Sequence, residues 1–438
     1  MPERPSARAA IALVTDDFTE LPPPPRQSEP DGPLAWDGYD ALRARAADRT
    51  GEDESVVCGT ARIEGTPAVL IAFEFGFLGG SLGERTGDRL EVAHIHARDH
   101  RLPVVALIAT GGSRMQEGMV ALTQLQRVAR QSALTREAGL PQLAVLRDPT
   151  TGGGWATLGA GADVILALPG AQVGFAGSRV RPADADPAAY TAEAQVAAGA
   201  ADAVVRPEEL RPTLGRWLRL LSAPSTEPAP PPHPLGATGL PASGWAAVQR
   251  ARSPQRPRAR SYLDAYFAHR VAISGDRCGG TDDGMLCGFG DHEGRTVAYA
   301  AHTGTATRPA GYRTAARLIR LADRLGIPVL TLVDTPGAAN DAEAERQGVG
   351  AAIADLFGAV AAARTPITTL VIGEGGSGGA LALAAPGTTW ATPDSYFSVI
   401  APELAAAILK RPPEEVESTA DQLRIRPQDL TDLGIARP

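Results

Sequence analysis

The chain has 438 residues, of which 44% are hydrophobic and 21% charged, a composition typical of a globular protein long enough for two domains. Its formal net charge is −8 and no stripe of positive charge is present, so we expect no nucleic-acid partner. The three cysteines form no CxxC pair, and the apolar runs are short and broken by glycine. These patterns predict no metal site, no membrane span and a reducing, cytoplasmic location.

Residues 1–55 are rich in proline and arginine, and we interpret them as an N-terminal arm, partly extended, with a short helix over 39–47. Residues 56–221 then alternate apolar strands with helices, which predicts an α/β domain. The predicted strands cover 68–75, 104–109, 142–146 and 164–167, and the predicted helices cover 88–99 and 116–138.

Residues 222–257 carry a dense run of prolines, which is typical of a semi-rigid linker. The second domain, residues 258–438, has the same rhythm as the first. Its predicted strands cover 297–301, 329–334, 368–373 and 388–391, and its predicted helices cover 311–325, 350–363 and 402–410.

The second half also repeats the apolar runs and prolines of the first half at a nearly constant spacing. The apolar run 102–107 returns as 327–332, and its prolines give an offset of 328 − 103 = 225. Pro141 and Pro366, which precede the next predicted strand of each half, have the same offset. A repeat of this kind indicates two copies of one fold.

In each half, two predicted strands run into glycine turns that open helices. These glycines are Gly111, Gly112, Gly152 and Gly153 in the first half and Gly337, Gly378 and Gly379 in the second. A glycine at such a turn leaves backbone N–H groups uncovered, which suits a developing oxyanion. Glycines are also needed where a helix packs tightly on a strand, and for any single pair the two interpretations are equally supported. Paired turns in both halves favour the oxyanion site.

At these turns the sequence resembles the carboxyltransferase component of acetyl-CoA carboxylase, in the crotonase superfamily. The segments similar to the β subunit are 77–83, 111–118, 148–153 and 174–177, and those similar to the α subunit are 311–313, 334–338, 373–382 and 398–403. The resemblance implies an α/β fold class with two tandem crotonase-like (ClpP/crotonase) ββα-spiral domains. Residues 56–221 would form the acyl-CoA side and residues 258–438 the biotin side.

The resemblance further implies transfer of CO₂ from carboxybiotin to the α-carbon of acetyl-CoA or a short acyl-CoA, a reaction that would serve fatty-acid or polyketide synthesis. The first-half turns would hold the thioester enolate, and the second-half turns the biotin ureido oxygen, with Gly375 and Gly376 as further biotin contacts. Biotin itself would serve as the base, so no His or Cys nucleophile is needed. Arg114 and Arg179 are candidate contacts for CoA phosphates, with an ordinary surface arginine as the equal alternative.

Lys410 is the only lysine in the sequence, and it lacks the Met-Lys-Met setting of biotin carrier domains. We therefore expect the cofactor on a separate biotin carboxyl carrier protein, served by a biotin carboxylase. We interpret Lys410 as a charge at a helix end rather than a substrate contact. A homo-oligomer is expected, because in this family the active site often forms across a subunit interface.

Several features depart from the family. The four-cysteine zinc ribbon of many β subunits is missing. The segment 181–189 is shorter than the helical stretch that the family usually has there, and Trp155 stands where a small residue is expected. Both changes affect the expected acyl pocket, so the identity of the acyl substrate stays open. His94, His96 and His100 do not share a helix face, which favours a solvated helix over a metal site.

Two alternative functions stay open at this point. The first half also resembles malonate decarboxylase subunits, so the chain could be a malonyl-thioester decarboxylase that uses the same oxyanion site. It could also be a non-catalytic assembly partner of a carboxylase, although intact glycine turns in both halves argue against this.

Overall fold

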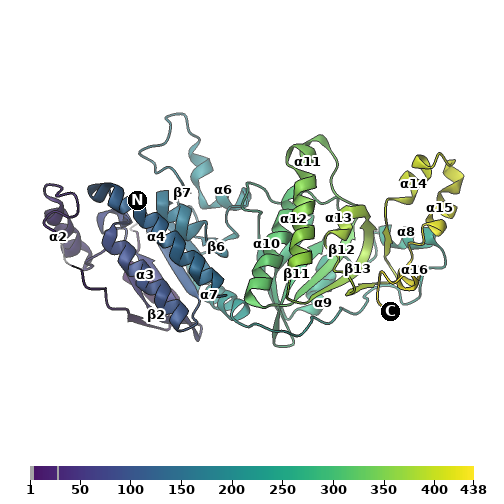
Figure 1. Ribbon diagram of the computed structural model, residues 1–438, viewed down its shortest axis with the longest axis horizontal. Helices are drawn as coiled ribbons and strands as arrows, with labels where there is room; N and C mark the ends of the chain where they lie inside the picture. Colours follow the sequence, from purple (N-terminus) through teal and green to yellow (C-terminus); the bar gives the residue numbers. More distant parts are fainter. Residues whose placement is uncertain (1–3, 27–28) are drawn as a thin grey trace. The chain divides into compact units, whose positions relative to one another are not determined.

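The computed structural model describes residues 4–26 and 29–438, so residues 1–3 and 27–28 of the predicted N-terminal arm lie outside the described residues. The chain divides into two units, Met1–Ser222 and Ala223–Pro438 (Figure 1). Each unit has its own β-sheet and its own buried core.

In the described part of the first unit, eight strands form one mixed sheet, in the order β1-β2-β3-β4-β5-β6-β8, with β7 paired to the end of β5. The strands are β1 (Asp17–Glu20), β2 (Val56–Ile63), β3 (Thr66–Phe73), β4 (Val104–Thr110), β5 (Gln142–Thr151), β6 (Val164–Ala167), β7 (Val173–Gly174) and β8 (Ala203–Val204). Strand β4 is buried along its whole length and pairs in parallel with both neighbours. Because such a strand is covered on both faces, it appears in the sequence as a continuous apolar run.

The helices of the first unit cover both faces of this sheet. They are α1 (Ala7–Val14), α2 (Tyr39–Thr50), α3 (Glu84–Asp99), α4 (Gly118–Glu137), α5 (Gly152–Gly154), α6 (Ala192–Ala197) and α7 (Pro207–Leu221). Helix α3 packs on α4 and on β2 and β3, and in Figure 1 α3 and α4 lie side by side along the sheet. Helices α1 and α7 contact each other and also reach β2 and β3. Alternate residues of a strand point to opposite faces, so both layers bury apolar side chains.

In the described residues of the second unit, seven strands form a sheet in the order β14-β13-β12-β11-β10-β9, with β15 paired to β13. The strands are β9 (His269–Ile273), β10 (Met285–His292), β11 (Arg295–His302), β12 (Val329–Thr335), β13 (Ile367–Gly376), β14 (Thr389–Ala391) and β15 (Tyr396–Ser398). The pairs from β11 to β14 are parallel, whereas β9, β10 and β11 pair antiparallel.

The helices of the second unit are α8 (Gly244–Arg252), α9 (Ala259–Tyr266), α10 (Pro309–Leu325), α11 (Ala342–Arg346), α12 (Val349–Ala362), α13 (Ser377–Leu381), α14 (Pro402–Ile408), α15 (Val416–Gln422) and α16 (Pro427–Asp432). Helix α10 packs on α12 and on β10 and β11, while α9 contributes Tyr262 and Leu263 to the core beside Tyr299 and Leu330. Within the described residues, no helix is both long and apolar enough to cross a bilayer.

The two sheets share one topology. The order β2-β3-β4-β5-β6 of the first unit matches β10-β11-β12-β13-β14 of the second, and the short strands β7 and β15 pair with the ends of β5 and β13. The parallel register shifts at corresponding places, between Ile108 and Thr110 and between Val333 and Thr335. The predicted α/β fold class with two tandem copies is therefore confirmed.

Residues 222–257, which we interpreted as a semi-rigid linker outside the core, pack against the second unit. Ala229 is buried in the core of the second unit, and its carbonyl oxygen accepts a hydrogen bond from the Thr368 hydroxyl at 2.7 Å. The Tyr266 hydroxyl donates to the Pro230 carbonyl at 2.9 Å, and α8, within this segment, packs on β13 and α15. Proline lacks an N–H but keeps an accepting carbonyl, so a proline-rich stretch can pack where donors face it.

The N-terminal arm is also folded where it is described. Helix α1 buries four side chains, strand β1 pairs with β2, and the Ala7 amide donates to the Glu74 carboxylate at 2.7 Å. The helix predicted over 39–47 is present as α2. Composition alone does not reveal these contacts, because their partners lie far along the chain.

Candidate active site at the paired glycine turns

The first turn of the first unit follows β4 and is held by a short parallel bridge between Leu82 and Ser113. The Leu82 amide donates to the Gly112 carbonyl at 2.8 Å, and the Arg114 amide donates to the Leu82 carbonyl at 2.9 Å. In a parallel bridge of this form, the residue between the two contacts turns its own N–H to the other side. Within the described residues the Ser113 amide has no hydrogen-bond partner, so it is free to donate to a ligand.

The second turn of the first unit follows β5 and touches the first. Gly152 has a φ of +63°, and a Cβ placed on it would lie 2.9 Å from the Gly112 Cα. Only glycine allows the two backbones to approach so closely. The next residue, Gly153, is in the first turn of α5, where the amides have no intrahelical partner. The amides of Ser113 and Gly153 therefore come from two touching turns.

The second unit repeats the bridge and its two hydrogen bonds. The Thr307 amide donates to the Gly337 carbonyl at 3.1 Å, and the Ala339 amide donates to the Thr307 carbonyl at 2.9 Å, bracketing Ala338. The residue 225 positions before Ala338 is Ser113. A Cβ on Gly379 would lie 2.6 Å from the Ala338 nitrogen, so the turn after β13 also touches the turn after β12.

Several of the predicted glycine amides already donate hydrogen bonds within the protein. The Gly111 and Gly152 amides donate to the carbonyls of Gly79 and Phe175, at 2.9 and 3.0 Å. The Gly112 and Gly337 amides each donate, at 3.1 Å, to a threonine hydroxyl two residues earlier in the same turn. Sequence reasoning located the turns but missed Ser113 and Ala338, because the bridges that orient their amides come from distant segments.

The glycines of the turn after β13 have different surroundings. Gly378 and Gly379 lie in the first turn of α13, where amides are unpaired within the helix. A Cβ on Gly378 would meet no atom within 4 Å, so this glycine borders open space. Gly375 and Gly376, predicted as biotin contacts, are buried; a Cβ on the first would overlap the Phe397 ring and on the second the Pro336 carbonyl. Their small size is explained by packing.

Arg114 is not placed to contact CoA phosphates, which corrects that prediction. Its side chain is only 1% exposed and forms an ion pair with Glu54 inside the first unit. Arg179, the other candidate, is exposed in the segment after β7. Arg179 alone therefore keeps the predicted role.

The three histidines and the tryptophan that we singled out in the sequence of the first unit contact other parts of the protein. His94 is buried, its Nδ1 lies 3.0 Å from the Thr135 hydroxyl, and burial lowers the pKa of the ring to about 4. His96 and His100 stack on each other outside the core. Within the described residues, no group of three or more His, Cys, Asp or Glu side chains could hold a metal ion. Trp155 is 9% exposed and belongs to the core cluster.

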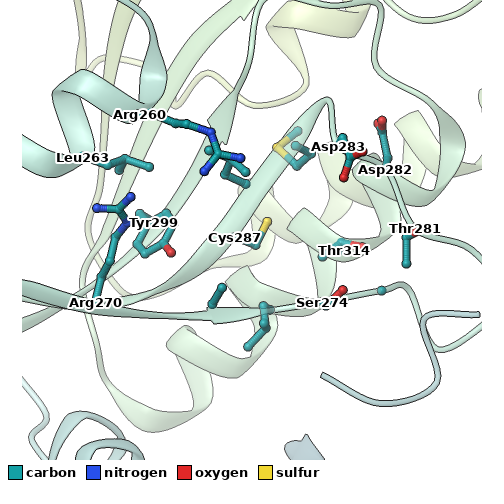
Figure 2. A pocket seen from close by; sticks show the side chains of 15 residues that line it. Arg260, Leu263, Arg270, Ser274, Thr281, Asp282, Asp283, Cys287, Tyr299 and Thr314 are labelled. Carbon is teal, nitrogen blue, oxygen red and sulfur yellow. The ribbon is translucent and has the colours of Figure 1, made fainter. Parts of the chain in front are cut away.

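A pocket of about 260 Å³ in the second unit lies apart from the turns, since none of the turn residues lines it. Figure 2 shows Arg260 and Arg270 at one end and Asp282 and Asp283 at the other. Residues of β9 and β10 line it, and β9 is the last strand in the order of the sheet, so the pocket lies near a sheet edge. The paired turns remain the better candidate for chemistry.

The carboxyl transferase domain model matches residues 35–206, and the model described as acetyl co-enzyme A carboxylase carboxyltransferase-like matches residues 241–437. The acetyl-coenzyme A carboxylase carboxyl transferase subunits beta/alpha of Saccharopolyspora erythraea is 39% identical, covering 91% of this chain and 73% of its own length. Its counterpart in Salinispora arenicola is 38% identical, covering 98% and 81%.

A third relative, a probable biotin-dependent acyl-coenzyme A carboxylase beta3 subunit of Mycobacterium tuberculosis, is 35% identical, covering 93% of this chain and 84% of its own. Among solved structures, transcarboxylase 12S matches with a TM-score of 0.80 at 21% identity, covering 98% of this chain and 86% of that one. A single-chain, multi-domain long-chain acyl-CoA carboxylase matches with a TM-score of 0.75 at 20% identity, covering 99% and 45%. These structures support the crotonase-like carboxyltransferase fold.

Proposed function

The chain belongs to the family of acetyl-coenzyme A carboxylase carboxyl transferases, and from this premise we propose that its two pairs of glycine turns serve the two sides of one carboxyl transfer. The protein would move CO₂ from carboxybiotin, presented by a separate carrier, to the α-carbon of acetyl-CoA or another short acyl-CoA. The observation that carries this proposal is a backbone amide at the same place in each unit, that of Ser113 and that of Ala338, which has no hydrogen-bond partner among the described residues.

The first unit would bind the acyl thioester. The amides of Ser113 and Gly153 would donate to the thioester oxygen and stabilise the negative charge that develops on it when the α-carbon becomes nucleophilic. Preorganised donors of this kind contribute roughly 2.7–4 kcal/mol each to transition-state stabilisation. Arg179, exposed after β7, would meet the phosphates of the CoA moiety.

The second unit would bind the biotin ring. The amides of Ala338 and Gly378 would donate to the ureido oxygen, and the open space beside Gly378 leaves room for the ring. Carboxybiotin supplies the CO₂. The contribution of this unit is to orient the ureido group and to stabilise the charge on its oxygen, so no nucleophilic side chain is required.

The carrier would be a different protein. Lys410, the only lysine of the sequence, is exposed just after α14 and lacks the Met-Lys-Met setting of a biotin attachment site. We therefore propose a biotin carboxyl carrier protein and a biotin carboxylase as partners.

We also propose that the chain forms a homo-oligomer. Large apolar side chains are exposed near the turns of both units: Met115 is 79% and Phe175 74% exposed in the first, and Val399 is 71% exposed in the second. Apolar patches of this kind typically mark interaction sites. Sedimentation of the purified protein would test this, and a monomer at micromolar concentration would contradict it.

The central test uses malonyl-CoA labelled with ¹⁴C in its free carboxylate. With biotin or a biotinylated carrier, we expect label to move to biotin. Release of labelled CO₂ without biotin would instead make the protein a malonyl-thioester decarboxylase. If the protein showed neither transfer to biotin nor release of CO₂, it would be a non-catalytic assembly partner.

A variant separates the second unit's role from its fold. Gly378→Ala adds a methyl group beside the proposed ureido site without meeting any protein atom, so we expect transfer to fall about 100-fold with unchanged unfolding. Gly358→Ala, also in open space but within α12, is the matched control and should transfer normally.

A further inference from the structure

A cluster of charged side chains is buried directly behind the Ser113 turn. Arg114, Glu54, Glu117 and Tyr39 are each less than 6% exposed, and they come from three separate segments of the first unit, since Arg114 and Glu117 are only three residues apart. Burying charges costs free energy unless they are paired and hydrogen-bonded, so a cluster of this kind needs an explanation beyond packing.

Arg114 binds the segment that orients Ser113 through both its backbone and its side chain. Its backbone amide donates to the Leu82 carbonyl at 2.9 Å, which is one half of the Leu82–Ser113 bridge. Its guanidinium donates to the carbonyl and the hydroxyl of Ser81, at 2.7 and 3.1 Å. The residues before and at the bridge are thus tied to the residue that follows Ser113.

The two glutamates hold this guanidinium in place. Glu54 accepts from both terminal nitrogens of Arg114, and although burial favours its neutral form, the charge and hydrogen bonds of Arg114 lower the pKa of Glu54 to about 2. The Glu117 carboxylate accepts a hydrogen bond from a terminal nitrogen of Arg114 at 3.5 Å and one from the Glu84 amide at 2.5 Å. A Cβ on Gly83 would lie 2.6 Å from the Glu117 carboxylate, so the chain leaves room for this carboxylate.

Tyr39 connects the cluster to the N-terminal arm. Its hydroxyl donates to Glu117 at 2.5 Å and accepts from Arg114 at 3.2 Å. Tyr39 is the first residue of α2, so this helix is joined by two hydrogen bonds to side chains of the Ser113 turn.

The second unit shows that the fold does not require this cluster. Ala339 stands at the position of Arg114, yet the Thr307–Ala338 bridge has the same hydrogen bonds as the Leu82–Ser113 bridge. The backbone turn therefore forms without an arginine at this position. What the cluster adds in the first unit is restraint on a turn that already has its shape.

We propose that Tyr39, Glu54, Arg114 and Glu117 are positioning residues that fix the Ser113 amide for the acyl-CoA half of the reaction. The inference rests on the proposed function of that amide. None of the four touches the substrate; they act through the bridge, and α2 becomes part of the catalytic support. Small misplacements of a preorganised donor are costly, at up to about 100-fold in rate.

Tyr39→Phe tests this with the least risk to folding, because it removes only a hydroxyl. We expect the kcat of malonyl-CoA-dependent transfer to biotin to fall about 10-fold, with the KM for malonyl-CoA within about twofold. Hydrogen–deuterium exchange should become faster in residues 111–117 and stay unchanged in residues 335–339. Glu117→Gln should show the same pattern. Tyr266→Phe, which removes a buried hydroxyl bonded to the Pro230 carbonyl, is the control and should change neither.

The outcomes are distinguishable. Unchanged kcat or unchanged exchange at 111–117 in both folded variants overturns the inference while leaving the proposed function intact. If the unaltered protein shows no transfer, the proposed function fails instead, and faster or unchanged exchange at 111–117 still decides whether the cluster restrains the turn.

Discussion

The two units build the same turn and support it in opposite ways. In both, a threonine hydroxyl accepts from a positive-φ glycine two residues later, Gly112 in one and Gly337 in the other. The supporting ion pair follows the turn in the first unit, at Arg114, but precedes it in the second, at Asp334.

This difference shows which part of the site is fixed by backbone chemistry. The bridge hydrogen bonds and the positive φ of Gly112 and Gly337 are common to both copies, because they give the turn the shape that orients the amide. Charged side chains behind the turn differ, because many arrangements can stiffen the same backbone. The units can therefore be tested against each other.

The largest effect is expected where the backbones approach most closely. In the second unit this residue is Gly376, where a Cβ would overlap the Pro336 carbonyl, whereas the corresponding residue of the first unit is Thr151. Gly376→Ala should lower the free energy of unfolding by about 4 kcal/mol or more, since backbone atoms cannot yield. Urea unfolding measures this. Thr151→Ala should cost far less, and equal losses would mean that the two turns are packed alike.

The next effect concerns the ion pair of the second unit. Asp334→Asn leaves Arg256, which is 6% exposed, without its counter-charge, and we expect a loss of about 3–5 kcal/mol in urea unfolding. Glu54→Gln should cost less, because Arg114 keeps Glu117 as a partner. The reverse order would show that Glu117 does not compensate.

Sequence reasoning predicted the repeat and the turns because these depend on local signals. Buried parallel strands such as β4 and β12 appear as apolar runs, and the turn glycines follow them directly. The offset of 225 then predicted a duplicated fold. The same signals predicted which loops carry the candidate site.

The failures share one physical cause, which is contact between residues far apart in sequence. Arg114 looked like a phosphate contact because its partner Glu54 lies 60 residues away. The amide of Ser113 was missed because Leu82 orients its neighbours. The linker was misjudged because Thr368 and Tyr266 supply donors to proline-rich backbone. No local pattern contains this information.

Among its described residues each unit also contains one buried histidine, and these two predict acid sensitivity. Burial lowers the pKa of His94 to about 4 and that of His302 to about 3. Below about pH 6.5 these histidines bind a proton in the unfolded chain but stay neutral in the folded protein. The free energy of unfolding therefore decreases by about 1.4 kcal/mol per pH unit for each histidine. Stability is full above pH 6.5 and falls as the pH drops toward these lowered values.

Between pH 7 and pH 5 each histidine should therefore contribute a loss of about 2 kcal/mol, measured by urea unfolding at both pH values. His302→Leu should remove its share of the slope, as should His94→Leu. The Glu54 carboxylate does not interfere, because its lowered pKa places its loss of stabilisation below about pH 4.5. A slope unchanged in both variants would contradict this assignment.

The smallest effect distinguishes a structural from a functional Lys410. This lysine has a φ of +58° after the end of α14, and its amide donates to the Ala407 carbonyl at 3.0 Å. Because a left-handed conformation costs a non-glycine residue about 1 kcal/mol, Lys410→Gly should stabilise the protein by up to that amount. Lys410→Ala removes the same charge without relieving the backbone and should not stabilise. If both variants lost carboxyl transfer, Lys410 would have to contact the substrate or the carrier; normal transfer with stabilisation by glycine alone makes it a helix terminus and nothing more.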